Sequence, residues 1–363
     1  MPVLSWWDVG NPVIGERKWR KGASAHTKIV RAYTQRAMPR APGEYARPAV
    51  SAVILTRNRR EALSHVLDRL LEEPVTEILV VDNGSSDGTA EHVRGYSPRV
   101  RLLEPGKNLG LGGRNLAAGE ASGELLLMLD DDAYPLPGAV ENLLEAFAAN
   151  PRLGVAGGLV RDIDSAGHVL VEDELGTFDW WLRAGRTGEA PPEGFPAFSF
   201  PEGACMIRRE AYVETGGFFE PYFLTNSEVD LAARLHANGW EVRYFPSAVF
   251  DHMKADSERQ AWDVNLYFRI RNHLWYIWLR FPASVAVRRT IGYLAFDFVQ
   301  AIYHRAPSAW WRGVRDAWRL REQVRGQRRP LPRSALRRAE LNRGRMHARL
   351  LVGQVTRKLR RAS

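Results

Sequence analysis

A run of five apolar residues that ends in three aspartates constrains this chain more than any other feature. Residues 125–129 show no alternation of apolar and polar side chains, which is typical of a strand buried on both faces of a sheet. Asp130, Asp131 and Asp132 follow directly. Ligands usually bind at the carboxyl ends of strands in an α/β sheet, and a hard divalent cation favours carboxylate oxygens. The pattern therefore indicates a cation site, with a solvated acidic turn as the alternative.

Residues 49–56, 77–82 and 100–104 are predicted strands, separated by segments with helical periodicity. This alternation predicts an α/β fold with a doubly wound, mostly parallel sheet. Thr56 and Arg59 follow the first strand, and Asp82 ends the second. Because the carboxyl ends of parallel strands meet at one edge, we expect these side chains to line the same crevice as the three aspartates.

The polar residues of this crevice suit a nucleotide. Asp82 is placed to accept hydrogen bonds from a base or a ribose, or else to close its own turn. Arg59 and Arg114 carry the positive charge that a diphosphate needs. The glycine-rich segment 108–115 is neither a dinucleotide-binding fingerprint nor a phosphate-binding loop, so a dehydrogenase or an NTPase is disfavoured.

Four segments, 55–59, 80–89, 108–115 and 129–132, resemble in order the signature segments of family 2 glycosyltransferases. The resemblance covers about residues 50–280 and implies a GT-A fold with a nucleoside-diphosphate sugar donor, UDP- or dTDP-linked. It implies that Asp82 binds the base, that Asp130 binds the ribose side, and that Asp132 binds Mg²⁺ or Mn²⁺. Asp131 is grouped with the donor-binding residues.

The second half continues the resemblance. Segment 203–210 is similar to the acceptor-side segment, and 227–231 stands where the family usually has Glu-Asp-x-Asp-Leu. This implies that Glu228 is the general base, although the family usually has aspartate there, and Asp230 is the alternative base or a structural residue. The family also places a metal-binding histidine at the end of the last strand, here His252. Segment 266–272 resembles the Arg-Asn segment of the rhamnosyl- and galactofuranosyltransferase branches.

Charge and composition divide the chain into three predicted regions: a basic extension (1–47), a catalytic domain (48–255) and a basic, aromatic-rich helical region (256–363). The net charge is +9, with an acidic middle and arginine-rich flanks. Such flanks favour contact with an anionic membrane surface, with packing against the catalytic domain as the alternative. No nucleic-acid-binding module accompanies the charge. The single cysteine, Cys205, favours a reducing compartment, and we expect neither a signal peptide nor a membrane span.

The sequence thus predicts an inverting, metal-dependent glycosyltransferase. It would move a sugar to a hydroxyl of a polysaccharide or lipid-linked glycan, in the cytoplasm and peripherally at the inner face of the cell membrane. The non-enzymatic alternative is an inactive GT-A domain that acts as an assembly scaffold. Haloacid dehalogenase-type phosphatases and sugar nucleotidyltransferases are disfavoured, because their motifs belong on or directly after the first strand.

Overall fold

The computed structural model describes residues 48–172, 191–253 and 262–332. The predicted N-terminal extension (1–47) lies outside the described residues, as do residues 333–363 of the predicted basic helical region. Within the described residues, no helix has the length and apolar character needed to cross a membrane.

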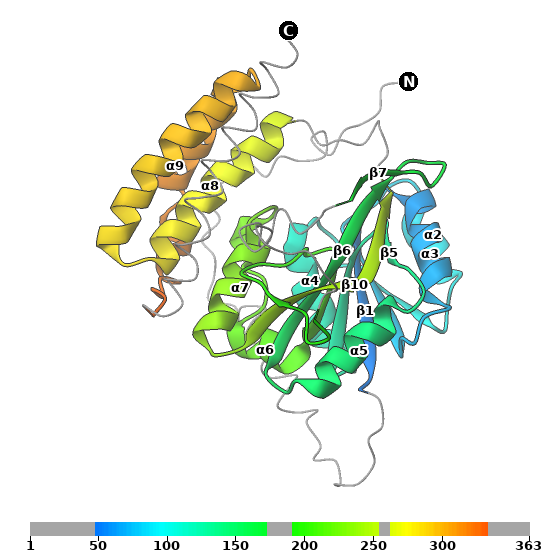
Figure 1. The fold of residues 1–363 in the computed structure, drawn as a ribbon. Coiled ribbons are helices and arrows are strands. Elements are labelled where there is room, and N and C mark those ends of the chain that lie inside the picture. The colour runs from blue at the N-terminus through cyan, green and yellow to red at the C-terminus, as the bar shows by residue number, and fades with distance from the viewer. Residues whose placement is uncertain (1–47, 173–190, 254–261, 333–363) are drawn as a thin grey trace, which may run out of the picture.

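The described residues form one mixed sheet with helices on both of its faces (Figure 1). The strands are β1 (Val50–Thr56), β2 (Glu77–Asp82), β3 (Val100–Leu103), β4 (Leu125–Asp130), β5 (Ala133–Pro135), β6 (Leu153–Ile163), β7 (Val169–Glu172), β8 (Phe195–Pro196), β9 (Ala204–Arg208) and β10 (Glu241–Met253). The helices are α2 (Arg60–Leu70), α3 (Thr89–Arg94), α4 (Gly113–Glu120), α5 (Ala139–Ala149), α6 (Arg209–Thr215), α7 (Ser227–Ala237), α8 (Trp262–Arg280), α9 (Ala283–Tyr303), α10 (Pro307–Arg319) and α11 (Glu322–Arg325), with short 3-10 turns η1 (Gly110–Gly112) and η3 (Glu220–Tyr222).

The first half of the sheet is parallel, as the sequence predicts. Its order is β3-β2-β1-β4, and the register pairs Thr56 with Asp82 and Leu55 with Asp130. The three strand ends that carry polar residues therefore lie at one edge. Beyond β4 the sheet becomes mixed, because β9 runs antiparallel between β4 and β6 while β10 runs parallel to β6.

Two hydrophobic layers hold the helices against the sheet. On one face, the apolar sides of α2, α3 and α5 pack on side chains such as Ile54 and Leu127. On the other face, α4, α6 and α7 pack on the alternate side chains, such as Val53 and Met128. The unbroken apolar run of β4 is thus buried on both faces, as its lack of alternation predicts.

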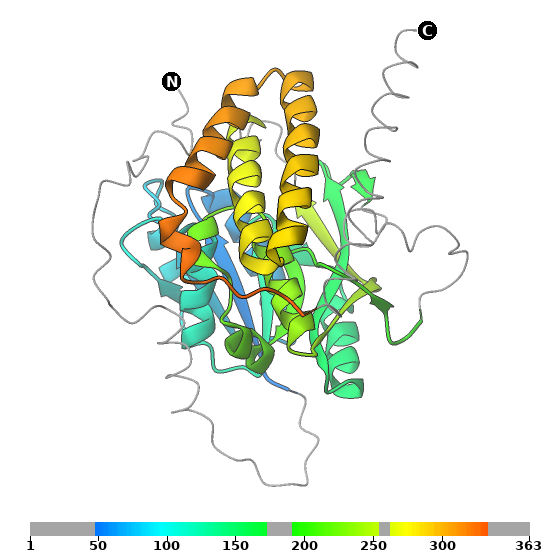
Figure 2. The same cartoon turned by 90° about the vertical axis from the view of Figure 1, so that its left-hand side faces the viewer.

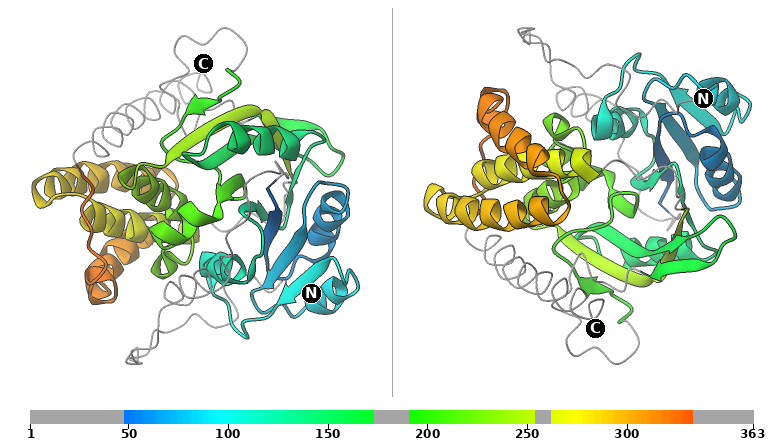
Figure 3. Two further views of the ribbon diagram at one scale, coloured as in Figure 1. Left: turned by 90° about the horizontal axis from the view of Figure 1, so that it is seen from below. Right: turned by 90° about the horizontal axis from the view of Figure 1, so that it is seen from above.

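Helices α8, α9 and α10 form a third apolar cluster beside the catalytic sheet (Figures 2 and 3). Small residues on α10, Ala309, Gly313 and Ala317, face inward, and a Cβ at Gly313 would clash with Ile270 of α8. The Asn272 amide on α8 donates hydrogen bonds to the carbonyl oxygens of Tyr222 (3.0 Å) and Thr225 (3.1 Å). The helical region is thereby joined to the loop that precedes α7.

Candidate active site

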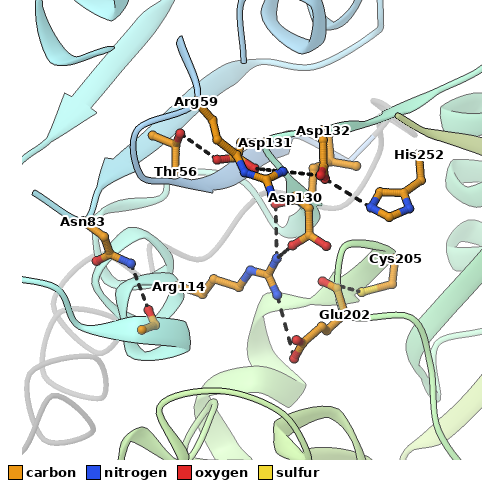
Figure 4. A network of polar contacts seen from close by, with 12 residues as sticks. Thr56, Arg59, Asn83, Arg114, Asp130, Asp131, Asp132, Glu202, Cys205 and His252 are labelled. Atoms are coloured by element: carbon orange, nitrogen blue, oxygen red, sulfur yellow. Dashed lines mark hydrogen bonds and ion pairs between the residues drawn. The ribbon is translucent and has the colours of Figure 1, made fainter. Parts of the chain in front are cut away.

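The carboxyl ends of β1, β2 and β4 gather the predicted donor-binding residues at one place (Figure 4). Thr56 Oγ1 donates a hydrogen bond of 2.8 Å to Asp131 Oδ2. Asp82 Oδ1 accepts hydrogen bonds from the Ser85 amide (2.8 Å) and the Ser85 hydroxyl (2.6 Å). Asp82 therefore closes its own turn, which was the structural alternative, and the turn holds the carboxylate at the sheet edge.

Asp131 and Asp132 share the guanidinium of Arg59. Arg59 Nη1 lies 3.5 Å from Asp131 Oδ1 and also contacts Asp132. Burial raises the pKa of Asp131 to about 7 against the opposing charge of Arg59. The pKa of Asp132 is lowered although burial opposes this, because His252 and Arg59 stabilise its charged form. Asp132 is thus the more acidic member of the pair, and Asp131 is hydrogen-bonded to Thr56.

His252 and Asp132 face each other across the junction of β10 and β5. His252 Nε2 lies 3.4 Å from Asp132 Oδ1, and His252 Nδ1 lies 2.8 Å from Asp162 Oδ1 on β6. Asp162 orients the ring so that Nε2 points toward Asp132, as carboxylates do for metal-binding histidines. The hydrogen bond to Asp132, with that to Asp162, raises the pKa of His252 to about 9.

This geometry fits two ligands of a divalent cation. Adjacent ligands of an octahedral Mg²⁺ are about 3 Å apart, close to the 3.4 Å between His252 Nε2 and Asp132 Oδ1. Among the described residues, no group of three or more His, Cys, Asp or Glu side chains is arranged to hold a metal ion. A cation here would therefore take its remaining ligands from a substrate or from water.

Arg114 lies between Asp130 at the end of β4 and Glu202 before β9. Its side chain is fully buried, and Nη2 lies 2.6 Å from Asp130 Oδ1 and 3.2 Å from the Leu129 carbonyl oxygen. Arg114 Nη1 lies 4.0 Å from Glu202 Oε2. Burial and the charge of Glu228 raise the pKa of Glu202 to about 8. The arrangement favours a supporting role for Arg114 over the direct diphosphate contact expected from the sequence.

Gly203 packs directly against the side chain of Asp130. A Cβ at position 203 would overlap the carboxylate of Asp130. The glycine of segment 203–210 therefore lets the backbone before β9 approach the carboxylate at the end of β4.

The two candidate bases lie in different environments. Asp230 is fully buried, and its carboxylate is held by Arg280 (Nε to Oδ1, 2.5 Å) and Arg234 (Nε to Oδ2, 2.9 Å). Burial would raise the pKa of Asp230, but the two arginines outweigh it and lower the pKa. Glu228, in the first turn of α7, is only partly buried and lies close enough to Glu202 to affect its pKa. The arrangement favours Glu228 as the base and Asp230 as a structural anchor.

The loop before α7 is strained and clamped. Phe223, Thr225 and Asn226 all have positive φ angles, of 64°, 59° and 64°, which costs non-glycine residues of order 1–3 kcal/mol each. Arg271 Nη2 donates to the Tyr222 carbonyl oxygen at 2.9 Å, beside the Asn272 hydrogen bonds to the same loop. The Arg-Asn segment singled out in the sequence thus fixes the entry to the helix that carries Glu228.

Sequence reasoning missed Asp162, Glu202 and the two arginines that hold Asp230. Asp162, Glu202 and Arg280 carry no local signal, because each reaches the site through a long-range contact. Arg234 lies one helical turn after Asp230 on α7, so its i,i+4 spacing was a local signal for this ion pair. Asp162 meets His252 through the parallel pairing of β6 with β10, and Glu202 meets Arg114 through the antiparallel pairing of β9 with β4.

Comparison with known proteins gives the class. The sequence model described as Glycosyl transferase family 2 matches residues 51–216. An N-acetylglucosaminyl-diphospho-decaprenol L-rhamnosyltransferase of Mycobacterium tuberculosis is 35% identical over 214 residues, 51% of this chain and 69% of that protein. The probable glycosyltransferase YdaM of Bacillus subtilis is 25% identical over 60% of this chain and 52% of its own length. A crystal structure of GalNAc-T7 with UDP, GalNAc and Mn²⁺ superposes with a TM-score of 0.55 at 13% identity, over 76% of this chain and 58% of that chain.

The sheet, the polar strand ends and these similarities define an α/β glycosyltransferase with the predicted GT-A fold. The chain belongs to glycosyltransferase family 2, in its rhamnosyltransferase branch. Both the family and the enzyme class predicted from the sequence are confirmed.

Proposed function

We propose that this enzyme transfers a sugar from a UDP- or dTDP-sugar to a hydroxyl of a lipid-linked glycan, with a divalent cation at Asp132 and His252. The observation that carries the proposal is the His252–Asp132 pair, in which Asp162 holds the His252 ring. The pair lies at the sheet edge where β2 ends with Asp82 and β4 ends with Asp130. A lipid-linked acceptor and rhamnose as the sugar are supported by the 35% identical relative, whose name specifies a diphospho-decaprenol acceptor and an L-rhamnosyl group.

The chain's own residues support a single displacement. A bound Mg²⁺ or Mn²⁺ would supply positive charge for the departing diphosphate, and Asp132 and His252 would hold it. Glu228 accepts the proton of the acceptor hydroxyl while that oxygen attacks the anomeric carbon. The bond to the diphosphate breaks on the opposite face, so the anomeric configuration is inverted. Arg114 holds Asp130 in place through their 2.6 Å contact.

A lipid-linked acceptor also suggests where the enzyme works. We propose that it acts at the cytoplasmic face of the cell membrane, held there peripherally, since no described helix can span a bilayer.

Calorimetric titration with UDP and with dTDP, in the presence and absence of Mn²⁺, tests the donor site. We expect one of the two nucleotides to bind with Mn²⁺, and Asp132→Ala to abolish the effect of Mn²⁺. The control is Glu322→Ala, since Glu322 is exposed on α11, which packs against α8. If neither UDP nor dTDP bound, with or without Mn²⁺, the result would contradict the proposal and favour the scaffold alternative.

A further inference from the structure

Helix α9 presents an apolar face to solvent. Its buried residues, among them Tyr293, Asp297 and Ala301, lie on one side. The opposite side carries exposed Val287, Ile291, Phe298, Val299, Ile302 and Tyr303, and Ile291 is 67% exposed. These residues recur at helical spacing, so they form one stripe along most of the helix. A water-facing helix normally has the reverse pattern.

Helix α10 repeats this arrangement with aromatic residues. Its inward face is made of Ala309, Gly313 and Ala317. Trp311 and Trp318, seven residues apart and therefore on one face, are 61% and 70% exposed on the opposite side. Figure 1 shows α8 lying between α9 and the catalytic domain, so the exposed stripe of α9 faces away from that domain.

Positive charge surrounds these apolar residues. Residues 278–332 contain eleven arginines, of which Arg280 is buried against Asp230, and three acidic residues. Asp297 is buried, Asp316 pairs with Arg315 at 2.8 Å, and Glu322 lies 3.5 Å from Arg321 and from Arg325. The Arg321 guanidinium also lies 4.2 Å from the centre of the Trp318 ring. The surface therefore combines exposed tryptophan and aliphatic side chains with a positive net charge.

We propose that the exposed faces of α9 and α10 are the surface by which this protein binds an anionic lipid bilayer. Apolar side chains would enter the boundary between headgroups and acyl chains, tryptophans would lie at the headgroup level, and arginines would contact lipid phosphates. The inference deepens the proposed function and rests on it in one respect, because it assigns the surface that would bring the enzyme to a lipid-linked acceptor.

Charge argues against a second copy of the chain as the occupant. In a two-fold symmetric dimer the same patch meets itself. Here that would bring two arginine-rich surfaces together, and like charges across an interface are costly. An anionic bilayer offers the opposite charge and an apolar interior.

Co-sedimentation of the full chain with vesicles tests the proposal. We expect binding to vesicles of phosphatidylcholine with phosphatidylglycerol, and weaker binding to phosphatidylcholine alone or at high salt. The double variants Ile291→Ser/Ile302→Ser and Trp311→Ala/Trp318→Ala should each weaken binding by about tenfold or more, since each withdraws two large apolar groups. Leu170→Ser is the matched control, because Leu170 is 53% exposed on β7 of the catalytic domain.

Two further measurements separate the possible failures. Nucleotide binding without vesicles should be the same in the double variants as in the wild type, which shows that they fold and that the donor site is independent of this surface. Light scattering reports the oligomeric state. The proposal would be overturned if the wild-type protein did not bind anionic vesicles, or if the double variants bound them as tightly as the wild type. A wild-type dimer that the double variants dissociate would also overturn it.

Discussion

Replacing Asp230 by Asn separates structural from catalytic carboxylates in α7. Asn keeps the shape of the side chain but removes its charge from a fully buried site where Arg280 and Arg234 contact both oxygens. Removing one partner of a buried ion pair costs roughly 3–5 kcal/mol, because the remaining charges lose their compensation. We expect a loss of that size in the free energy of unfolding, measured by urea denaturation at neutral pH.

The pH dependence follows from the lowered pKa of Asp230. The unfolded chain protonates this carboxyl near its ordinary value, whereas the folded protein keeps it charged to lower pH. Its stabilising contribution is therefore complete above the unfolded pKa and disappears as the pH falls through the folded pKa. The stability difference between wild type and Asp230→Asn should accordingly shrink below about pH 4.

Glu228→Gln should affect activity and not stability, the opposite of Asp230→Asn. Removing a general base lowers turnover by about 10²- to 10⁴-fold, while a partly buried side chain leaves the free energy of unfolding little changed. Asp263→Asn is the control for surface pairs, since the Asp263 side chain is about half exposed and lies 3.4 Å from Arg312. This substitution should cost no more than about 1 kcal/mol. An Asp230→Asn variant with wild-type stability and no activity, beside an active Glu228→Gln, would refute the assignment.

Two further predictions concern the contacts around Asp130 and Glu202. Gly203→Ala should weaken nucleotide binding in calorimetry, because its Cβ displaces the Asp130 carboxylate. Gly292→Ala is the control and should have no effect, since a Cβ there meets no neighbour. Equal nucleotide affinities of the two variants would contradict the packing argument. The raised pKa of Glu202, about 8, means that the folded protein holds this proton more tightly than the unfolded chain does. Wild-type stability should therefore fall relative to Glu202→Gln as the pH rises from about 4.5 to about 8, and parallel stability curves would exclude a buried, protonated Glu202.

Local patterns in the sequence determined much of this protein. The apolar runs of β1, β2 and β4, the polar residues at their carboxyl ends and the order of the four motifs are all local. Each depends on residues close together in the chain, so strand, turn and family can be inferred from the sequence. The parallel arrangement that brings Thr56, Asp82 and Asp130 to one edge follows from the repeated strand-helix units.

Only the tertiary structure showed which of the remaining charged residues contact one another. Asp162 and His252 are ninety residues apart, and Arg280 on α8 reaches Asp230 on α7 across fifty residues. A carboxylate's environment decides whether it is an anchor, a metal ligand or a base, because burial and neighbouring charge set its pKa. The apolar stripe of α9 also needed the tertiary structure, because periodicity alone predicts only a helix with an apolar face. Only the packing of α8 against the opposite side showed that this apolar face is turned to the outside.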